Sequence, residues 1–141
     1  MSKKRHRARM LTAQALYQWQ VGGQNPEKIL KQFLEEHANR KFHQAYFQEI
    51  FSGVVFNIDL VDDQIKQDID REINELDPVE RAILRLSTYE LIKKIEVPYK
   101  VVINEAVELA KTYGADQSHK YINAILDKMV RRLRKLEVEN G

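Results

Sequence analysis

The clearest helix start in the chain lies in the stretch DPVERAILRLSTYEL, residues 77–91. Asp77 is suited to cap the helix, and Pro78 to occupy its first position. Glu80 stands third, where its carboxylate can reach back to the cap backbone in a capping box. Apolar residues then recur at helical spacing: Val79, Ala82, Ile83, Leu86, Tyr89 and Leu91. The stretch therefore predicts a helix that begins at Pro78.

Four helices are expected on the N-terminal side of this stretch. The first covers residues 7–20 and is stopped by Gly22-Gly23. The second begins at Asn25-Pro26, which supply a cap and a first-turn proline. The third covers about residues 44–58. The acidic stretch after residue 59 keeps the helical period in four apolar residues: Val61, Ile65, Ile69 and Ile73.

Two helices are expected on the C-terminal side. Pro98 ends the region after residue 91, because the residue before a proline avoids the helical conformation. The next helix ends at Gly114, which is expected to adopt the left-handed conformation. Ser118 is expected to cap the last helix. The core face of that helix is predicted to consist of Ile122, Ile125, Leu126, Met129, Leu133 and Leu136.

These patterns predict an all-α fold of about seven helices. The 141 residues fit one domain, and five glycines with three prolines are too few for a hairpin-rich β fold. A mild division falls near residues 57–60. We expect one domain over residues 1–141, with an N-terminal lobe of about 1–58 and a C-terminal lobe of about 59–141, because some 60 residues alone are marginally stable.

Composition excludes several classes of protein. With no cysteine, the chain has no disulfide, thiolate metal site or cysteine nucleophile. No run approaches the ~20 apolar residues that cross a bilayer, so we expect no membrane association. The basic N-terminus lacks the apolar core of a signal peptide. These features favour a cytoplasmic location.

The sequence contains no recognisable catalytic or cofactor-binding motif. The five glycines form neither a P-loop nor a dinucleotide-binding turn. The four histidines are scattered, without the spacing of a metal site. Glu105 and Glu108 share a helix face, as many solvated pairs do. We therefore expect a binding module that is not an enzyme and that has no metal and no cofactor.

Charge is segregated along the chain although the net charge is only +2. Residues 1–10 and 128–135 are rich in lysine and arginine and lack acids, whereas residues 57–80 are acidic. Short basic blocks of this kind often bind nucleic acid. The alternative is a frayed tail and a solvated helix face, and charge alone does not decide between them.

Three stretches together resemble one family. The first is Arg7-Ala8-Arg9 followed by AQALYQW at 13–19, and the second is ERAILR at 80–85 with VPYKVVINEAVELAK at 97–111. The third is GADQSHKYINAILD at 114–127. In this order, and nearly end to end, they resemble the NusB family of bacterial transcription antitermination factors.

This resemblance implies two small packed helical bundles and a cytoplasmic bacterial protein. It implies binding to the boxA sequence in nascent ribosomal RNA leader transcripts. It also implies a partner, the small-subunit ribosomal protein called NusE in this role. NusA, NusG and RNA polymerase are expected in a larger complex that supports ribosomal RNA synthesis. A homodimer that hides the arginine surface is a further possibility in this family.

The resemblance places the RNA surface at the N-terminal basic segment and the start of the last helix. The basic segment supplies phosphate contacts, and an aromatic beside a lysine can stack a splayed base. The predicted RNA-binding residues are Lys3, Lys4, Arg5, Arg7, Arg9, Lys100, Lys120 and Tyr121. The competing interpretations are a solvated arm for Arg7 and Arg9, and a tyrosine at the core edge for Tyr121.

The family positions associated with the NusE contact are Tyr17 and Glu80, although Glu80 also fits the capping box. Trp19 is expected in the core. Two residues depart from the family pattern: Ala124 replaces a common glycine, and Gln117 replaces a common acid. Losing that negative charge should strengthen phosphate attraction, so we expect Gln117→Asp to weaken RNA binding.

Two other functions remain as alternatives. One is a protein-only helical adaptor or dimerising scaffold, whose basic ends merely keep it in solution. The other is the RNA-binding part of a ribosomal RNA methyltransferase, because a related helical domain precedes the catalytic part of such enzymes. That enzyme needs a glycine-rich cofactor loop, which these 141 residues lack. From the initial methionine and the polar final residues, we expect a complete chain.

Overall fold

The computed structural model describes residues 2–141, which contain helices and no strands. The elements are α1 (Lys3–Gly22), α2 (Pro26–Glu36), α3 (Gln44–Phe56), α4 (Ile58–Lys66), the 3-10 helix η1 (Ile73–Glu75), α5 (Pro78–Lys93), α6 (Tyr99–Tyr113), α7 (Ser118–Leu133) and α8 (Lys135–Asn140). The all-α prediction is confirmed. The expected count of about seven differs mainly because the last helix is interrupted, which adds the short α8.

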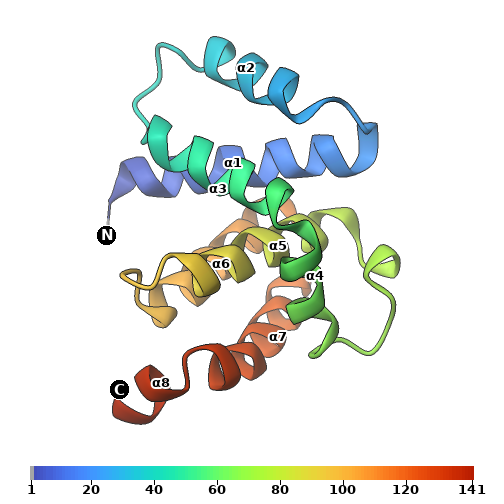
Figure 1. Cartoon of the computed structure of the whole chain (residues 1–141), viewed down its shortest axis with the longest axis vertical. Helices are drawn as coiled ribbons and strands as arrows, with labels where there is room; N and C mark the ends of the chain where they lie inside the picture. The colour runs from blue at the N-terminus through green and yellow to red at the C-terminus, as the bar shows by residue number, and fades with distance from the viewer. Residues whose placement is uncertain (1) are drawn as a thin grey trace.

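Helix α5 is the centre of the molecule. It packs against α1, α3, α4, α6 and α7 (Figure 1), and every residue from 82 to 91 is buried. The predicted start is confirmed, because Asp77 Oδ1 accepts hydrogen bonds from the backbone N of Val79 at 2.9 Å and of Glu80 at 3.2 Å. The capping box is wrong. The Glu80 carboxylate instead accepts a hydrogen bond from Ser118 Oγ at 2.8 Å, so it joins α5 to α7.

Buried Arg85 on α5 has partners that hold two other helices to it. Arg85 donates to both carboxylate oxygens of Asp62 on α4, each at 2.9 Å, and to Gln20 Oε1 on α1 at 3.0 Å. Buried charges cost free energy unless paired in this way. These contacts set α4 and the end of α1 against the central helix.

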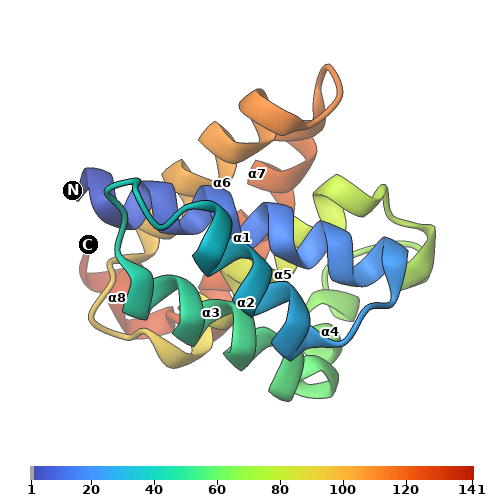
Figure 2. The same cartoon turned by 90° about the horizontal axis from the view of Figure 1, so that it is seen from above.

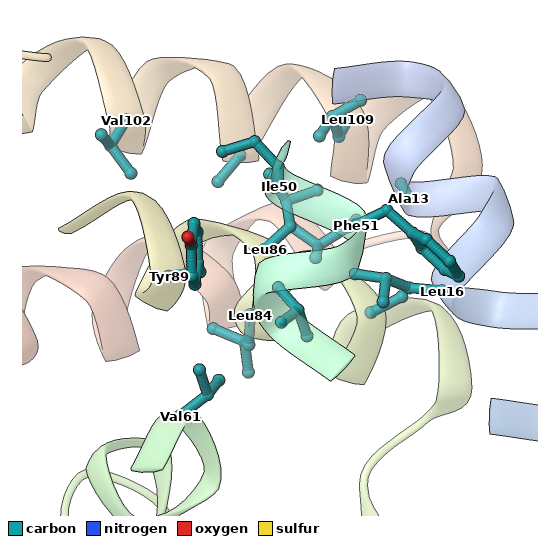
Figure 3. Packing of buried hydrophobic residues seen from close by; sticks show 14 of the residues in the cluster. Ala13, Leu16, Ile50, Phe51, Val61, Leu84, Leu86, Tyr89, Val102 and Leu109 are labelled. Atoms are coloured by element: carbon teal, nitrogen blue, oxygen red, sulfur yellow. The ribbon is translucent and has the colours of Figure 1, made fainter. Parts of the chain in front are cut away.

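The core lies where α1, α3 and α5 meet. Leu16, Ile50, Phe51 and Leu86 face one another there (Figure 3), and all four are fully buried. Removal of this apolar surface from water is the main force that holds the helices together. Gly53 on α3 lies against the ring of Tyr89, where a Cβ atom would overlap the ring. The two helices approach this closely because glycine has no side chain.

Helix boundaries differ from the predicted ones at two places in the N-terminal half. Helix α1 is longer, from Lys3 to Gly22, and stops where Gly23 adopts the left-handed conformation with φ of 66°. Helix α4 ends at Lys66, so the predicted helical period through Ile73 is broken. Acidic side chains oppose the helix dipole at a carboxyl end, which disfavours continuation through Asp68 and Asp70. Ile73 is nevertheless buried, from η1.

The turn between α6 and α7 also differs. Gly114 is extended, with φ of −85° and ψ of 169°, and the left-handed residue is Gln117, with φ of 74°. Ser118 is the first residue of α7 and not its cap, because its hydroxyl is engaged by Glu80. The predicted left-handed Gly114 and Ser118 cap are therefore both wrong.

Arg134 interrupts the last helix and closes the carboxyl end of α5. This buried side chain donates to the backbone oxygens of Leu91 at 2.9 Å, Val97 at 3.0 Å and Lys94 at 3.1 Å. The chain turns at Arg134 into α8, which leaves Leu136 74% exposed. The prediction that Leu136 belongs to the core face was therefore wrong.

One buried cluster extends through both halves of the chain. Helices α1, α2 and α3 lie together on one side, and α6, α7 and α8 lie on the other side of α5 (Figure 1), while Figure 2 looks onto the side of α1, α2 and α3. Trp19 is half-buried and packs on the edge of this core, with its ring 5.9 Å from the Arg85 guanidinium. The division into two lobes near residue 58 stays a prediction.

Candidate RNA and partner interfaces

The basic N-terminal segment is the ordered first part of α1. Ser2 caps the helix, since its Oγ accepts a hydrogen bond from the backbone N of Arg5 at 3.2 Å. Lys3, Lys4 and Arg7 project into solvent, and the first turn contains no acid. The positive end of the helix dipole adds to these charges. This end of α1 therefore attracts anions.

Arg5 is held against an aromatic ring at the edge of this segment. Its guanidinium carbon lies 4.4 Å from the ring centre of Tyr46 on α3, and Lys94 Nζ lies 5.5 Å from the same ring. Cations gain electrostatic stabilisation over aromatic faces. Arg5 is consequently half-buried and oriented, whereas Lys3 and Lys4 extend freely.

Arg9 lies in the protein interior, with 1% of its surface exposed. Its Nε and Nη2 atoms donate to the two carboxylate oxygens of Glu90, and Nη1 donates to Glu105 Oε1, all at 2.8 Å. The Tyr46 hydroxyl donates to Glu90 Oε2 at 2.6 Å. Direct phosphate contact by Arg9 was predicted, and this expectation is wrong for the folded chain because every edge of the guanidinium is engaged inside.

The pKa values in this buried cluster follow from its contacts. Burial by itself lowers the pKa of Arg9, but the hydrogen bonds and charge of Glu90, with the charge of Glu105, outweigh burial and raise it. Burial also raises the pKa of Tyr46, and the Glu90 carboxylate raises it further. Arg9 therefore stays protonated and Tyr46 stays neutral, which preserves the hydrogen bonds at neutral pH.

The cluster continues to the protein surface through His6. The Nδ1 atom of His6 lies 2.9 Å from Glu105 Oε2, and the His6 side chain is 38% exposed. The sequence indicated that Glu105 belongs to a solvated pair, but Glu105 is buried whereas Glu108 is exposed. Glu90 and Glu105 were missed because linear spacing does not show that an arginine on α1 lies opposite them.

Lys100 lies near the same end of the molecule as the N-terminal basic segment. It is exposed in the first turn of α6. A hollow of about 290 Å³ is lined by Ser2 and Arg5 from the start of α1 and by Pro98 and Val101 from the start of α6. Val101, the residue after Lys100, thus lies beside the start of α1, and RNA binding by Lys100 stays a prediction.

Lys120 and Tyr121 lie at the other end of α6, in the first turn of α7. Lys120 is exposed, and Tyr121 is half-buried beneath Arg71, whose guanidinium carbon lies 5.2 Å from the ring centre. Burial raises the pKa of Tyr121, and Arg71 partly offsets this. Within residues 2–141 the buried Tyr121 hydroxyl has no hydrogen-bond partner. Arg71 was not foreseen from the sequence, because it lies in an acidic stretch.

Beside Tyr121 the surface is hollowed. A depression of about 380 Å³ is lined by Tyr121 and Ala124 of α7 and by Asp68 and Asp70 from the segment after α4. Ala124 is exposed, so its extra methyl group faces this depression without packing in the core. The surroundings contain both signs of charge, with Lys128 opposite the two acids.

The two predicted partner-binding residues lie near one apolar hollow. Tyr17 is 42% exposed and lines a depression of about 220 Å³ with Val79, Ala82 and Tyr113. Glu80 is half-buried next to Val79, with its carboxylate held by Ser118. An exposed aromatic beside an apolar hollow is typical of protein contact sites.

The NusB family model matches residues 6–131 of this sequence. The chain belongs to the NusB family. It is 48% identical over 138 residues to the transcription antitermination protein NusB of Pseudomonas savastanoi pv. phaseolicola, covering 98% of this chain and 84% of that one. The resemblance found in the sequence motifs is confirmed.

Solved NusB structures share the fold. T. maritima NusB superposes with a TM-score of 0.84 at 32% identity and covers 99% of both chains. A crystal structure of the antitermination factors NusB and NusE in complex with double-stranded RNA matches with a TM-score of 0.83 at 30% identity. It covers 93% of this chain and 98% of that chain.

Among residues 2–141, no group of three histidine, cysteine or acidic side chains is arranged to hold a metal ion. No helix of that range is both long and apolar enough to cross a membrane.

Proposed function

We propose that this NusB-family chain binds boxA-type single-stranded RNA in ribosomal RNA leader transcripts, together with NusE, and supports their transcription. The exposed basic side chains at the start of α1 carry the proposal. Lys3, Lys4 and Arg7 form no ion pair within residues 2–141, so their charges are available to phosphate. Phosphate contacts supply most of the affinity of such proteins.

The predicted base-reading contact is Tyr121, with Lys120 beside it. These two residues lie in the first turn of α7, one length of α6 away from the basic segment. A 15-residue helix is about 22 Å long. A single strand of several nucleotides spans such a distance, so the proposed RNA runs between the two ends of α6.

The proposed NusE contact uses the hollow beside Tyr17 and the neighbouring Glu80. A NusB relative has been crystallised with NusE and RNA, which supports this partner. We further propose that the complex acts in the cytoplasm with NusA, NusG and RNA polymerase and that the chain has no enzymatic activity. Homodimerisation would compete if it covered the arginine surface.

The test is equilibrium binding of a short boxA-type RNA and its scrambled control at two salt concentrations, with and without NusE. We expect a preference for boxA, a decline in log affinity with log salt of roughly 0.7 per phosphate contact, and tighter binding with NusE. Lys3→Gln, Lys4→Gln and Arg7→Gln should each reduce that slope. The matched control is Lys93→Gln, an exposed lysine at the end of α5.

Absence of any preference under all four conditions would overturn the proposal. A chain that binds NusE but no RNA would be the protein-only adaptor that the sequence left open. Sedimentation of the same samples would then reveal whether self-association covers the start of α1.

A further inference from the structure

A hollow of about 650 Å³ lies between α1 and the loop that joins α2 to α3. It adjoins the Tyr17 hollow, with which it shares Gln14, and it shares no residue with the Tyr121 depression. Arg7, Met10 and Leu11 line it from α1, and Arg40, Lys41 and Phe42 line it from the loop. Its volume lies within the range of pockets that hold small molecules.

Two hydrogen bonds to backbone carbonyl oxygens hold the walls of this hollow together. The backbone N of His43 donates to the carbonyl oxygen of Lys4 at 3.1 Å. Arg7 Nη1 donates to the carbonyl oxygen of Lys41 at 2.8 Å. The loop is therefore attached to the first turns of α1 at two points, and the hollow exists before any ligand arrives.

The rim of the hollow is positively charged. Arg7, Arg40 and Lys41 are all exposed, no acid lines the hollow, and none of the three forms an ion pair within residues 2–141. Three unpaired cations around one concave surface attract a phosphate group. Arg7 belongs at the same time to the basic segment, so the hollow continues the surface that meets the RNA backbone.

The floor of the hollow is apolar and includes an unsatisfied polar atom. Leu11 and Phe42, each 7% exposed, and Met10 supply the apolar part of its lining. His37 also lines the hollow, and its buried Nδ1 atom has no hydrogen-bond partner within the described chain. Buried polar atoms are nearly always satisfied, so the orphaned Nδ1 is a candidate partner for a polar group that enters the hollow.

We infer that this hollow is a nucleotide subsite that receives one unstacked nucleotide of a single-stranded RNA. The base lies on Met10, Leu11 and Phe42 with an edge toward His37, and the phosphate meets Arg7, Arg40 and Lys41. Single-stranded RNA is recognised by this combination of apolar contact with splayed bases and cationic contact with the backbone. The inference rests on the proposed RNA-binding function and adds a second base contact to Tyr121.

The first experiment removes the charges that belong to the loop. Arg40→Gln combined with Lys41→Gln should weaken binding of the boxA-type RNA about fivefold for each lost contact at 0.1 M salt, with little effect at 1 M. The matched control is Lys28→Gln combined with Lys31→Gln, which removes the same charge from exposed positions on α2. Because all four residues are exposed, both variants should retain the wild-type thermal midpoint. Equal RNA affinities of the two double variants would overturn the subsite.

The second experiment locates the base. Replacing each base of the RNA in turn by an abasic site should show one position, besides the one stacked on Tyr121, where affinity falls by about 5- to 150-fold. That penalty should persist in Tyr121→Ala and shrink in Met10→Phe, which narrows the hollow. A penalty that is unchanged in a folded Met10→Phe variant, or the absence of a second position, would overturn the inference.

Failure of this inference is distinguishable from failure of the proposed function. Wild-type boxA affinity in the Arg40/Lys41 variant, with the boxA preference retained, refutes the subsite and leaves the function intact. If the wild-type chain shows no preference, and the Arg40/Lys41 variant loses affinity for boxA and scrambled RNA alike, the subsite is supported and boxA recognition is refuted. Titration with adenosine monophosphate separates the two sources of a nucleotide: micromolar binding of the free nucleotide would overturn the assignment to an RNA strand.

Discussion

Arg9 and Glu90 form a two-point contact in the protein interior, with Nε to Oε1 and Nη2 to Oε2 both at 2.8 Å. The contact joins α1 to the central helix α5, 81 residues later in the sequence. Glu105 on α6 takes the remaining edge of the guanidinium. One arginine thereby fixes the position of the basic helix relative to the two helices beneath it, so that Arg7 faces outward.

Arg9→Met should destabilise the fold by about 3–5 kcal/mol, because it leaves the Glu90 and Glu105 carboxylates buried without their cation. Arg7→Met is the matched control on the surface; it removes one exposed hydrogen bond to the Lys41 carbonyl and should change stability by only about 1 kcal/mol. Urea unfolding measures both. In RNA binding the order reverses: Arg7→Met should lower the salt slope by about 0.7, and folded Arg9→Met should leave it unchanged. The opposite pattern would restore Arg9 as a phosphate contact.

Tyr46→Phe should make stability less sensitive to alkaline pH. Burial and the Glu90 carboxylate raise the pKa of Tyr46 in the folded chain above the value of 10 expected in the unfolded chain. The resulting stability is complete below about pH 10 and is lost as pH rises toward the folded-state pKa, at a slope of at most about 1.4 kcal/mol per pH unit. Urea unfolding between pH 9 and 11 should show a shallower decline for Tyr46→Phe than for the surface control Tyr17→Phe. Identical slopes in the two variants would contradict the buried hydroxyl contact.

Gly53→Ala should cost about 1–3 kcal/mol, since the added methyl group overlaps the Tyr89 ring and pushes α3 away from α5. Thermal unfolding gives the loss directly. The double variant with Tyr89→Leu removes the overlapping atoms, so the added cost of Gly53→Ala should nearly vanish in that background. A cost that is the same in both backgrounds would show that overlap with Tyr89 is not its cause.

Local signals in the sequence predicted where helices begin, but not the contacts between distant segments. The start of α5 was predictable because both of its signals are local. The Asp77 side chain caps backbone N–H groups two and three residues ahead, and Pro78 fixes its own backbone angle. The sequence predicted the left-handed residue at Gly114, whereas the structure has it at Gln117. The reason is that the turn depends on Glu80, which reaches across from α5 and holds Ser118. Contacts between distant segments have no local pattern.

The candidate site could be predicted only in part, again because contacts between distant segments have no local pattern. Exposed Lys3, Lys4 and Arg7 were predictable from a charged block without acids. The buried position of Arg9, two residues further on, depends on Glu90 and Glu105, which spacing along α1 does not reveal. One signal was present: Glu105 lies between Val102 and Ala106, on the apolar face of its helix, and a buried acid requires a buried cation.

Gln117→Asp should weaken RNA binding, because it adds a negative charge close to Lys120 at the start of α7. Gln117 is exposed, with φ of 74°, and aspartate tolerates this conformation well, so the variant should fold normally. Affinity for boxA-type RNA at matched salt is the measurement. Gln117→Asn keeps the shape without the charge and should bind like the wild type. Equal affinities of the Asp and Asn variants would contradict an electrostatic role.

Tyr121→Ala should reduce RNA affinity by about 1–3 kcal/mol if a base stacks on the ring. Tyr121→Phe should retain most of the affinity, because stacking needs only the ring. Arg71→Gln uncovers one face of the ring and serves as a second probe, since it separates stacking on that face from stacking elsewhere. Wild-type affinity in Tyr121→Ala would leave Tyr121 as an edge residue of the core.

The hydrogen bonds from Arg134 also govern the order of events while the protein is being made. The carbonyl oxygen of Leu91 accepts a hydrogen bond from Arg134, which is synthesised 43 residues later. At a translation rate of about 5–20 residues per second, that interval is about 2 to 9 seconds. During it the carbonyl oxygens of Leu91 and Val97 lack the Arg134 side chain that donates to them in the folded chain, so the carboxyl end of α5 is completed late.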